Sequence, residues 1–244
     1  MLMHKNYLIS IIIVTYNAEK HLGALMESLQ TRINDQTEVI VIDGLSTDST
    51  MVILHEYYKC ISKVISEKDS GIYDAMNKGI SMASGKYVLF LGADDRLLIN
   101  LEELSMFLKD DKTIYYGDVL LSPSNKIYGG KFNTAKLINR NICHQSILFP
   151  KAVFEKYQYG KDFRLMEDYA LNLKLWASKE FKFSYLEKTI SVYSLMGLSS
   201  LNIDLDFKKD SLKLIFRYFG PIGVVIKLFN PIRNFFKTSK NSLS

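Results

Sequence analysis

Apolar runs and segments with helical periodicity alternate through the first hundred residues of the chain. Three runs are almost uninterrupted, and each predicts a strand that is buried on both faces: "LISIIIVTYN" (8–17), "TEVIVID" (37–43) and "GKYVLFLGADD" (85–95). A shorter strand is predicted for "SKVISEK" (62–68). Continuous burial of this kind is typical of a parallel sheet that is covered by helices.

Helices are predicted between these strands. Apolar residues within 22–29 recur at helical spacing, and Asn17 is a candidate N-cap for this helix. The turn "GLSTDST" (44–50) has hydroxyls that can cap a helix beginning near Asp48, and residues 69–84 are expected to be a loop that enters a helix. Strands that alternate with helices predict a parallel sheet with right-handed crossovers.

The second half of the chain has a more mixed pattern. Residues 167–179, "EDYALNLKLWASK", carry apolar side chains at helical spacing and predict a helix. Short strands are predicted at 113–121, 126–132, 142–150, 181–186 and 190–195. We therefore expect an α/β fold with a mostly parallel central sheet flanked by helices, formed by residues 1–202, and a helical tail at 203–244.

Acidic residues follow the predicted parallel strands where each strand ends. Asp43 closes the second apolar run, Asp69 follows the short strand, and Asp94 and Asp95 close the last run. Parallel sheets bind ligands outside the carboxyl ends of their strands. We therefore expect four carboxylates to gather on one edge of the sheet, beside Thr15–Asn17.

Asp94 and Asp95 place two like charges at the end of a buried strand. Desolvation of an unpaired ion is costly, and a like charge nearby raises the pKa of at least one carboxyl group. A divalent cation, Mn²⁺ or Mg²⁺, relieves both effects because it prefers carboxylate and phosphate oxygens. A solvated turn, or an ion pair with Arg96, is the alternative that needs no metal.

Two common phosphate-binding motifs are not supported. No G-x-G-x-x-G follows the first strand, so a dinucleotide site of the Rossmann type is not indicated. The segment "GISMASGKY" (79–87) resembles a P-loop only loosely. Its glycines are one residue too far apart, and Tyr87 stands where Ser or Thr is needed.

Composition and charge set further limits. The chain has 244 residues, a net charge of +5 and two distant cysteines, so a disulfide framework or a zinc site is not expected. After Asp210 there is no acidic residue, whereas six Lys and Arg residues follow. No segment reaches the roughly 18 apolar residues of a membrane-spanning helix. The N-terminal apolar run predicts a strand rather than a signal peptide.

Four segments together resemble the family 2 glycosyltransferases, which have the nucleotide-diphospho-sugar transferase (GT-A) fold. They are "SIIIVTYN", "VIVIDGLSTDST", "EKDSGIYDAMNKGISMASGKYVLFLGADD" and "FRLMEDYALNLKL". The stretches "DSGIYDAMNKG", "CHQS" and "GLSS" are similar to bacterial enzymes that build surface polysaccharides. The resemblance implies that residues 1–100 bind the nucleotide and that residues 101–202 bind the acceptor.

The resemblance also implies a nucleotide-sugar site at the strand ends. Its predicted residues are Thr15, Tyr16, Asn17, Asp43, Asp69, Gly71, Asn77 and Asp94. Asp43 would accept the imide N–H of uracil, which favours UDP over GDP. Asp94 would face the ribose, and Asp95 would bind Mn²⁺ or Mg²⁺. Gly71 equally suits a simple turn, and Gly92 stands where the family more often has Asn.

A catalytic base is implied within "MEDYALNLKL" (166–175). Asp168 takes the base position, and Glu167 is the second candidate. The alternative is that both acids only stabilise the N-terminus of a helix, by roughly 0.3–1 kcal/mol. For His144 and Gln145, a structural role and a contact with acceptor or phosphate both stay open.

The tail at 211–240 mixes aromatic and aliphatic side chains with Lys and Arg, and Pro221 and Pro231 divide it into short helical pieces. This pattern is typical of a helix in a membrane interface, although a helix packed on the domain would show it too. We expect a cytoplasmic protein that can contact the inner face of the plasma membrane. Its acceptor would be a glycan or a polyprenyl-diphosphate-linked sugar, and no nucleic acid partner is expected.

The predicted activity is that of an inverting glycosyltransferase of bacterial O-antigen, capsule or exopolysaccharide biosynthesis. Asp168 would take the proton of an acceptor hydroxyl while UDP departs from the donor sugar. Two alternatives remain. A sugar-1-phosphate nucleotidyltransferase would need a Gly-rich basic loop after the first strand, which "TYNAEKHLG" (15–23) lacks. A non-catalytic protein that binds nucleotide sugars would carry the same pocket without turnover.

Overall fold

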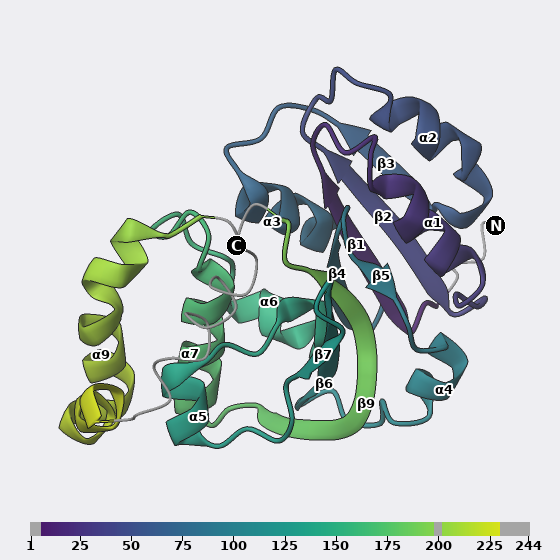
Figure 1. Ribbon diagram of the computed structural model, residues 1–244. Helices are drawn as coiled ribbons and strands as arrows, with labels where there is room; N and C mark the ends of the chain where they lie inside the picture. Colours follow the sequence, from purple (N-terminus) through teal and green to yellow (C-terminus); the bar gives the residue numbers. More distant parts are fainter. Residues whose placement is uncertain (1–5, 198–201, 230–244) are drawn as a thin grey trace.

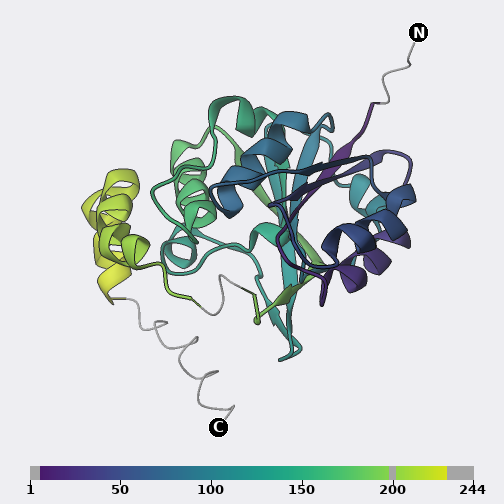
Figure 2. The same cartoon turned by 90° about the horizontal axis from the view of Figure 1, so that it is seen from above.

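The computed structural model describes residues 6–197 and 202–229, which form a curled sheet with helices on both faces (Figures 1 and 2). Within these residues the strand order is β3-β2-β1-β4-β8-β6-β9-β5, and β7 pairs with β6. The strands are β1 (Ile9–Thr15), β2 (Thr37–Asp43), β3 (Lys63–Ser66), β4 (Tyr87–Gly92), β5 (Arg96–Leu97), β6 (Thr113–Ser122), β7 (Lys126–Tyr128), β8 (Ile147–Pro150) and β9 (Lys182–Ser194). The predicted α/β class is confirmed.

The helices lie mostly between the strands in chain order. They are α1 (Leu22–Gln30), α2 (Thr50–Glu56), α3 (Ile72–Met82), α4 (Leu101–Ser105), α5 (Thr134–Asn139), α6 (Ala152–Lys156), α7 (Glu167–Ser178) and α9 (Leu205–Phe229), with short 3₁₀ turns η1 (Tyr58–Cys60) and η2 (His144–Ser146). β1 pairs in parallel with β2 and β4, and β2 pairs in parallel with β3. The carboxyl ends of these four strands therefore lie along one edge.

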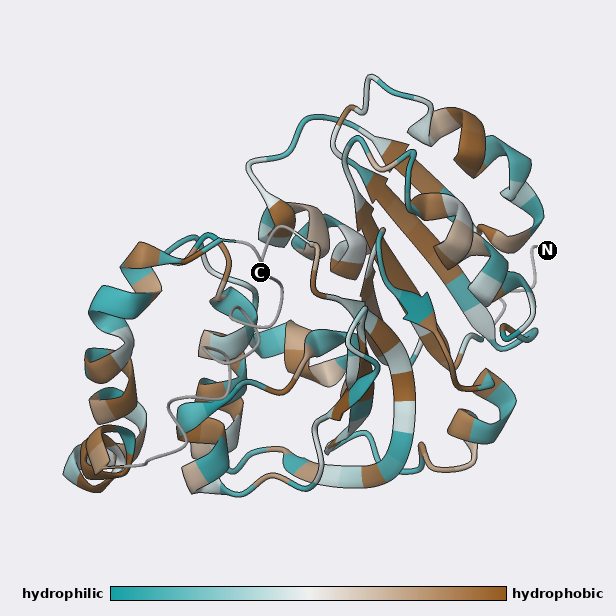
Figure 3. Ribbon diagram, in the orientation of Figure 1, coloured by the Kyte–Doolittle hydropathy of each residue, from teal (hydrophilic) through white to brown (hydrophobic). Residues whose placement is uncertain are grey.

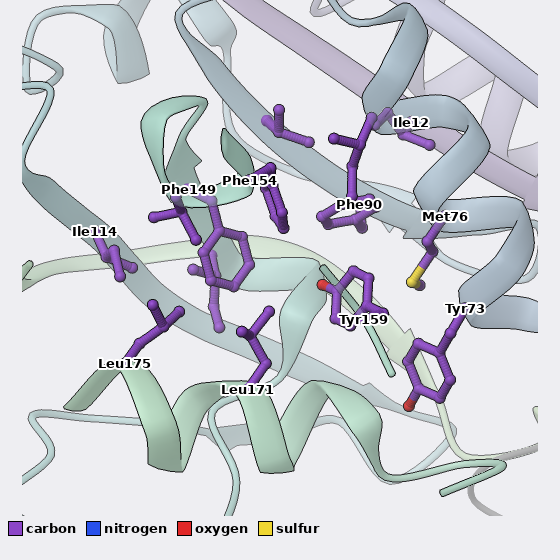
Figure 4. Packing of buried hydrophobic residues seen from close by; sticks show 14 of the residues in the cluster. Ile12, Tyr73, Met76, Phe90, Ile114, Phe149, Phe154, Tyr159, Leu171 and Leu175 are labelled. Carbon is purple, nitrogen blue, oxygen red and sulfur yellow. The ribbon is translucent and has the colours of Figure 1, made fainter. Parts of the chain in front are cut away.

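Side chains of the central strands alternate between two hydrophobic clusters. Ile12 of β1 and Phe90 of β4 belong to the cluster under α3, α6 and α7, whereas Ile11 belongs to the cluster under α1, α2 and α4. Figure 4 shows Phe90 beside Phe154 and Tyr159, with ring centroids 5.8 and 5.6 Å away. Cover on both faces explains why the apolar runs of β1, β2 and β4 are continuous.

Two predictions near the N-terminus are wrong in detail. Asn17 does not cap α1, because that helix begins only at Leu22. Asn17 instead has a φ of 48°, and its Oδ1 accepts a hydrogen bond from the N–H of Thr47 at 2.8 Å. This bond ties the loop after β1 to the loop after β2. The helix expected near Asp48 begins two residues later, at Thr50.

The two short strands predicted at 181–186 and 190–195 are parts of one strand, β9. Its ladder with β6 continues from one segment to the next across a register shift beside Asp118. Glu187 has a φ of 48° between the two segments. A bulge of this kind adds a residue to one strand without ending the pairing, and it interrupts the alternating pattern that the sequence shows.

The strands predicted at 142–150 and 126–132 are shorter than expected. In the first segment the turn η2 precedes the strand, so that β8 begins only at Ile147. In the second segment β7 ends at Tyr128, because the next two residues are glycines with φ values of 140° and 72°. Backbone in this region favours glycine and leaves the strand direction.

Helix α9 packs one face on the domain and exposes the other. Gly220, with a φ of 63°, and Pro221 break it into two pieces, as the sequence predicts. Phe207 contacts the ring of Tyr169, with centroids 5.2 Å apart, and Ile215 is buried. The exposed apolar side chains, which we call the outer face of α9, are Leu205, Leu212, Phe216, Ile222, Val225, Leu228 and Phe229. Figure 3 shows hydrophobic colour along this helix.

The described part of the tail bears on two predictions. Residues 198–201 and 230–244, which include Pro231 and the last three cationic residues, lie outside the described residues. Among the helices of 6–197 and 202–229, none combines the length and the apolar character that crossing a bilayer requires. The predicted boundaries at residues 100 and 202 stay predictions.

Candidate active site

The strand-end edge carries most of the predicted nucleotide-binding residues. Parallel pairing sets Thr15 of β1 opposite Asp43 of β2, and Val14 opposite Gly92 of β4. The hydroxyl oxygen of Thr15 is buried and has no hydrogen-bond partner among the described residues. Buried polar atoms are nearly always paired in folded proteins, so this hydroxyl is available to a ligand.

Asp43 is fully buried and orders the loop that follows β2. Its Oδ2 accepts hydrogen bonds from the N–H of Ser46 at 3.0 Å and from the hydroxyl of Ser66 at 2.6 Å, and its Oδ1 accepts one from the hydroxyl of Ser46. Groups of the protein therefore contact both oxygens. The predicted contact of Asp43 with uracil stays a prediction.

Tyr16, Asp69 and Gly71 lie on the same part of the edge. A Cβ atom at Gly44 would lie 2.7 Å from Oδ2 of Asp69 and 3.4 Å from Cδ2 of Tyr16, so both side chains border this glycine. The Tyr16 ring is 65% exposed. Gly71, with a φ of 124°, donates its N–H to Oδ1 of Asp69 at 2.9 Å directly before α3. An exposed ring and a carboxylate thus stand together beside the end of β2.

Asn77 joins the two halves of the domain. Its Nδ2 donates to the backbone carbonyl of Tyr159 at 2.9 Å, and its Oδ1 accepts from the backbone N–H of the same residue at 3.1 Å. Both ends of the amide therefore bind the loop before α7. Neither of these two bonds joins Asn77 to another predicted nucleotide-binding residue.

Asp95 is a buried carboxylate with few partners. It is 1% exposed, and its oxygens accept hydrogen bonds only from the backbone N–H groups of Gly92 at 2.7 Å and Ser194 at 3.3 Å within the described chain. Burial, followed by the charge of Asp94, raises the pKa of Asp95 to about 7. A Cβ atom at Gly92 would lie 3.0 Å from an oxygen of each acid, so a larger residue would crowd both carboxylates.

The donor chemistry of Asp94 and Asp95 fits a divalent cation such as Mn²⁺ or Mg²⁺. A raised pKa reports a carboxylate whose charge is not compensated, and a bound cation supplies that compensation. No group of three or more His, Cys, Asp or Glu that could hold a metal occurs in residues 6–197 and 202–229. The protein would therefore supply one or two ligands, which suits a cation that shares its shell with phosphates and water.

Asp168 is held by three side chains from separate elements. Its Oδ1 accepts from the Tyr73 hydroxyl of α3 at 3.0 Å, and its Oδ2 accepts from Nδ2 of Asn141 at 2.8 Å. Nδ1 of His144 lies 3.2 Å from the same Oδ2. Burial, followed by the charge of Asp168, raises the pKa of Tyr73 well above its usual range, so the phenol remains a donor. The carboxylate is thereby fixed at the N-terminus of α7.

Glu167 has different surroundings, although it is the neighbour of Asp168. Its Oε2 accepts from the N–H of Gly160 at 3.1 Å, and its Oε1 accepts from the N–H of Phe163 at 2.7 Å. Burial raises its pKa. These bonds hold the loop that precedes α7, and they turn the carboxylate toward the backbone of that loop.

Asp95 and Asp168 both interact with residues at or next to η2. Nδ1 of His144 lies 3.2 Å from Oδ2 of Asp168, and His144 also offsets part of the rise in the pKa of Asp95. Next to it, the thiol of Cys143 has a raised pKa, first because of burial and then because of the charges of Asp168 and Asp95. The strand-end acid and the helix-start acid, which are 73 residues apart in the sequence, therefore both lie near this short segment.

Comparison with known proteins decides the family. Residues 10–160 match the model of the family described as "Glycosyl transferase family 2". The chain belongs to this family. A glycosyltransferase of PGL/p-HBAD biosynthesis from Mycobacterium bovis is 31% identical to this family 2 glycosyltransferase over 210 residues, which cover 82% of each chain.

Two further proteins agree with this assignment. The Escherichia coli UDP-Glc:alpha-D-GlcNAc-diphosphoundecaprenol beta-1,3-glucosyltransferase WfgD is 32% identical over 139 residues, which cover 56% of this chain and 54% of WfgD. S. aureus TarS, residues 1–349, in complex with UDP-GlcNAc superposes with a TM-score of 0.74 at 17% identity, covering 97% of this chain and 76% of TarS. The TarS likeness shows that this glycosyltransferase has the GT-A fold.

Three polar residues of the site are absent from the sequence-based predictions: Tyr73, Asn141 and Asn172. Tyr73 lies on the apolar face of α3, where a phenol needs a polar partner. Asn172 follows Asp168 by four residues, so both side chains lie on one face of the almost fully buried helix α7. Those two spacings could have indicated the site, whereas Asn141 lies in a loop and has no comparable signal.

Proposed function

We propose that this family 2 glycosyltransferase is an inverting, metal-dependent enzyme. It transfers a sugar from a UDP-sugar to a hydroxyl of a lipid-linked glycan in bacterial polysaccharide biosynthesis. The observation that carries the proposal is that Asp95 and Asp168 both interact with His144, Asp168 by direct contact and Asp95 electrostatically. One carboxylate suits the cation that accompanies a diphosphate, and the other suits the proton of an acceptor hydroxyl.

The donor side of the proposal rests on the strand-end edge. The unpaired hydroxyl of Thr15 can bond a polar group of the nucleotide, and the exposed ring of Tyr16 offers a face on which a base can stack. The names of WfgD and of the TarS complex specify UDP-sugars, which favours a UDP-sugar here. Asp69 and Gly71 border the same place and would contact the ribose or the phosphates.

Asp95, with Asp94 beside it, would hold Mn²⁺ or Mg²⁺. When bound, the cation would neutralise charge on the diphosphate leaving group. The chain itself places Asp95 in a nearly water-free position, where a carboxylate interacts strongly with a cation. Gly92 allows both acids to approach that position closely.

Asp168 would act as the base. The oxygens of Glu167 bind two backbone N–H groups of the preceding loop, whereas Asp168 faces η2 and the region of Asp95. A hydroxyl beside Asp168 would attack the anomeric carbon from the side opposite the departing UDP, which inverts the configuration there. General-base catalysis of this kind contributes about 10²- to 10⁴-fold to the rate.

The acceptor side rests on helix α9. Its outer face combines exposed apolar residues, such as Phe216 and Ile222, with Lys213 and Arg217 nearby. Apolar and cationic side chains together favour the interface of an anionic membrane, whose cytoplasmic leaflet carries negative lipids. The name of WfgD specifies a diphosphoundecaprenol-linked acceptor. We place the enzyme in the cytoplasm, at the inner face of the plasma membrane.

A coupled assay of UDP release tests the proposal. The purified chain is incubated with a panel of nucleotide sugars, Mn²⁺ and a lipid-linked sugar acceptor. We expect Asp95→Asn and Asp168→Asn each to lower kcat by at least about 10²-fold, while both variants stay folded by circular dichroism. Asp111→Asn, which alters an exposed carboxylate elsewhere, should keep the wild-type rate.

The outcomes separate the alternatives. Binding of a nucleotide sugar without any release of UDP would indicate a non-catalytic binding protein. Wild-type turnover in Asp168→Asn would remove the assigned base, and a product with retained anomeric configuration would contradict inversion.

A further inference from the structure

The hydrogen-bond partners of Asp168 are distributed unevenly over its two oxygens. Oδ2 has Asn141 at 2.8 Å and His144 at 3.2 Å, whereas Oδ1 has only the hydroxyl of Tyr73 at 3.0 Å. Each oxygen of an ionised carboxylate offers about two lone pairs to donors. Oδ2 is therefore the more occupied oxygen, and Oδ1 has more capacity to accept a further hydrogen bond.

We propose that the acceptor hydroxyl gives its proton to Oδ1 of Asp168, and that Asn141 and Asn172 are positioning residues that keep Oδ2 occupied. The inference rests on the proposed function. In this step the O–H bond of the acceptor breaks and its proton bonds to Oδ1. The oxygen's electron pair forms the bond to the anomeric carbon, and the pair of the broken sugar–phosphate bond leaves with UDP.

Asn141 can donate to Asp168 only in one orientation of its amide. Its Nδ2 must face Oδ2, because its own Oδ1 in that place would set two acceptors against each other. Nδ2 of Asn172 donates to Oδ1 of Asn141 at 2.8 Å and to the backbone carbonyl of Ile142 at 3.2 Å. Asn172 therefore fixes the orientation that makes Asn141 a donor to the base.

In this orientation the side-chain carbonyl of Asn172 is left unpaired. The residue is 0% exposed, and its Oδ1 has no hydrogen-bond partner among the described residues. A buried unpaired carbonyl costs about 1–3 kcal/mol. Turning the amide over would not help, because Oδ1 would then face the acceptor oxygens of Asn141 and Ile142. An apolar residue would remove this unpaired carbonyl, but it would also break both hydrogen bonds and leave the oxygens of Asn141 and Ile142 without a donor from position 172.

The hydroxyl of Tyr73 donates to Oδ1 of Asp168, so the position of Tyr73 shows where this oxygen lies. It belongs to the first turn of α3, two residues after Gly71, and thus to the element that follows the donor-side loop at Asp69. Asn141 and His144 come from the acceptor half and contact the other oxygen. Oδ1 therefore lies on the side of α3, whose preceding loop carries Asp69 and Gly71.

A double-mutant experiment on the full chain tests the inference. Asn172→Leu should stay folded in urea denaturation, although it exchanges one unpaired carbonyl for the oxygens of Asn141 and Ile142, which lose their donor. Its kcat should fall by up to about 100-fold, as expected for a misplaced catalytic group, while KM for the nucleotide sugar stays unchanged. In an Asp168→Asn background the same substitution should lower the residual rate no further, because the group it positions is gone.

Two further variants complete the design. Asn139→Leu, the same change on α5 outside this network, should leave kcat at the wild-type value. Asn141→Ala should lower kcat as Asn172→Leu does, and the pair combined should equal Asn141→Ala alone. Asn141→Ala also serves if Asn172→Leu does not fold.

The results distinguish the inference from the proposed function. If Asp168→Asn is inactive but Asn172→Leu and Asn141→Ala have the wild-type kcat, the positioning role is wrong and the proposed function stands. If Asn172→Leu lowers the rate by the same factor with and without Asp168, it acts by another route and the inference is overturned. If Asp168→Asn keeps wild-type activity, the proposed function itself is wrong.

Discussion

Two buried carboxylates, Glu38 and Asp95, lie at opposite edges of the same parallel strands and have opposite surroundings. Oε1 of Glu38 accepts hydrogen bonds from the hydroxyl of Ser10 and from both the hydroxyl and the N–H of Ser84, at 2.6–2.7 Å, and from the N–H of Gly85 at 3.1 Å. Burial alone would raise the pKa of Glu38, but these bonds outweigh it and the pKa is lowered. Asp95 has two backbone donors, and its pKa is raised to about 7.

The difference separates a carboxylate with several protein donors from a carboxylate with only two backbone donors. Both groups are almost fully buried, so burial does not distinguish them. Glu38 has enough donors to remain charged where β1, β2 and β4 begin, and it joins those strands. Asp95 lacks donors where β4 ends, and a strongly perturbed pKa at such a position is typical of a ligand site. The deficit of partners at Asp95, rather than its burial, points to a cation.

The largest expected effect comes from neutralising each carboxylate in turn. In metal-free protein at pH 8, Asp95→Asn should raise the free energy of unfolding by about 4 kcal/mol, because it removes a buried charge in a group whose pKa burial and Asp94 raise to about 7. Glu38→Gln should lower it by about 2 kcal/mol, since charge-assisted hydrogen bonds are lost. Urea denaturation with a chelator present measures both values. If the two variants changed stability in the same direction, the comparison would be wrong.

The two variants should also change the free energy of unfolding over different pH ranges. The pKa of Asp95 is raised on folding, so its penalty appears as pH rises from about 4 toward 7 and is fully present above 7. The pKa of Glu38 is lowered, so its stabilisation is present above about pH 4.5 and is lost as pH falls through the folded value. Parallel curves of stability against pH for wild type and variants would contradict both assignments.

A smaller effect is expected from the exposed apolar side chains on the outer face of α9. The double variant Phe216→Ser/Ile222→Ser on the outer face of α9 should bind phosphatidylglycerol vesicles about tenfold more weakly than the wild type, which is about 1.4 kcal/mol. Its binding to neutral phosphatidylcholine vesicles should be weak in either form. Vesicle sedimentation measures the change.

The matched control is Met106→Ser/Ile127→Ser, which removes two similarly exposed apolar side chains from the domain. It should bind like the wild type. Equal loss in both double variants would show that the outer face of α9 has no special role, and unchanged binding in the first would contradict membrane contact through this helix.

Much of the structure before residue 100 could be predicted from the sequence because its signals are local. The apolar runs of β1, β2 and β4 are each contained in seven or fewer residues, and the acids directly follow them. Once the sheet is parallel, Asp43 and Asp95 must lie on one edge. The structure adds that both oxygens of Asp43 accept hydrogen bonds from serine residues, whereas Asp95 has only two backbone donors among the described residues, and no local pattern carries that distinction.

The structure after residue 100 could be predicted only in part because its contacts are distant in sequence. Tyr73 and Asp168 meet across 95 residues, and Asn77 binds the backbone of Tyr159 across 82. The sequence predicts two strands in place of β9, because the bulge at Glu187 interrupts the alternation of side chains. Spacing within one helix or strand does not encode such contacts, which depend on how the loops between them close.

The most direct test of the central claim is a calorimetric titration of Mn²⁺ into the protein, with and without UDP. If Asp95 awaits a cation shared with the donor, the wild type should bind Mn²⁺ more tightly when UDP is present, and Asp95→Asn should lose that gain while remaining folded. Equal Mn²⁺ affinity in the wild type and Asp95→Asn, with UDP bound in both, would contradict the claim.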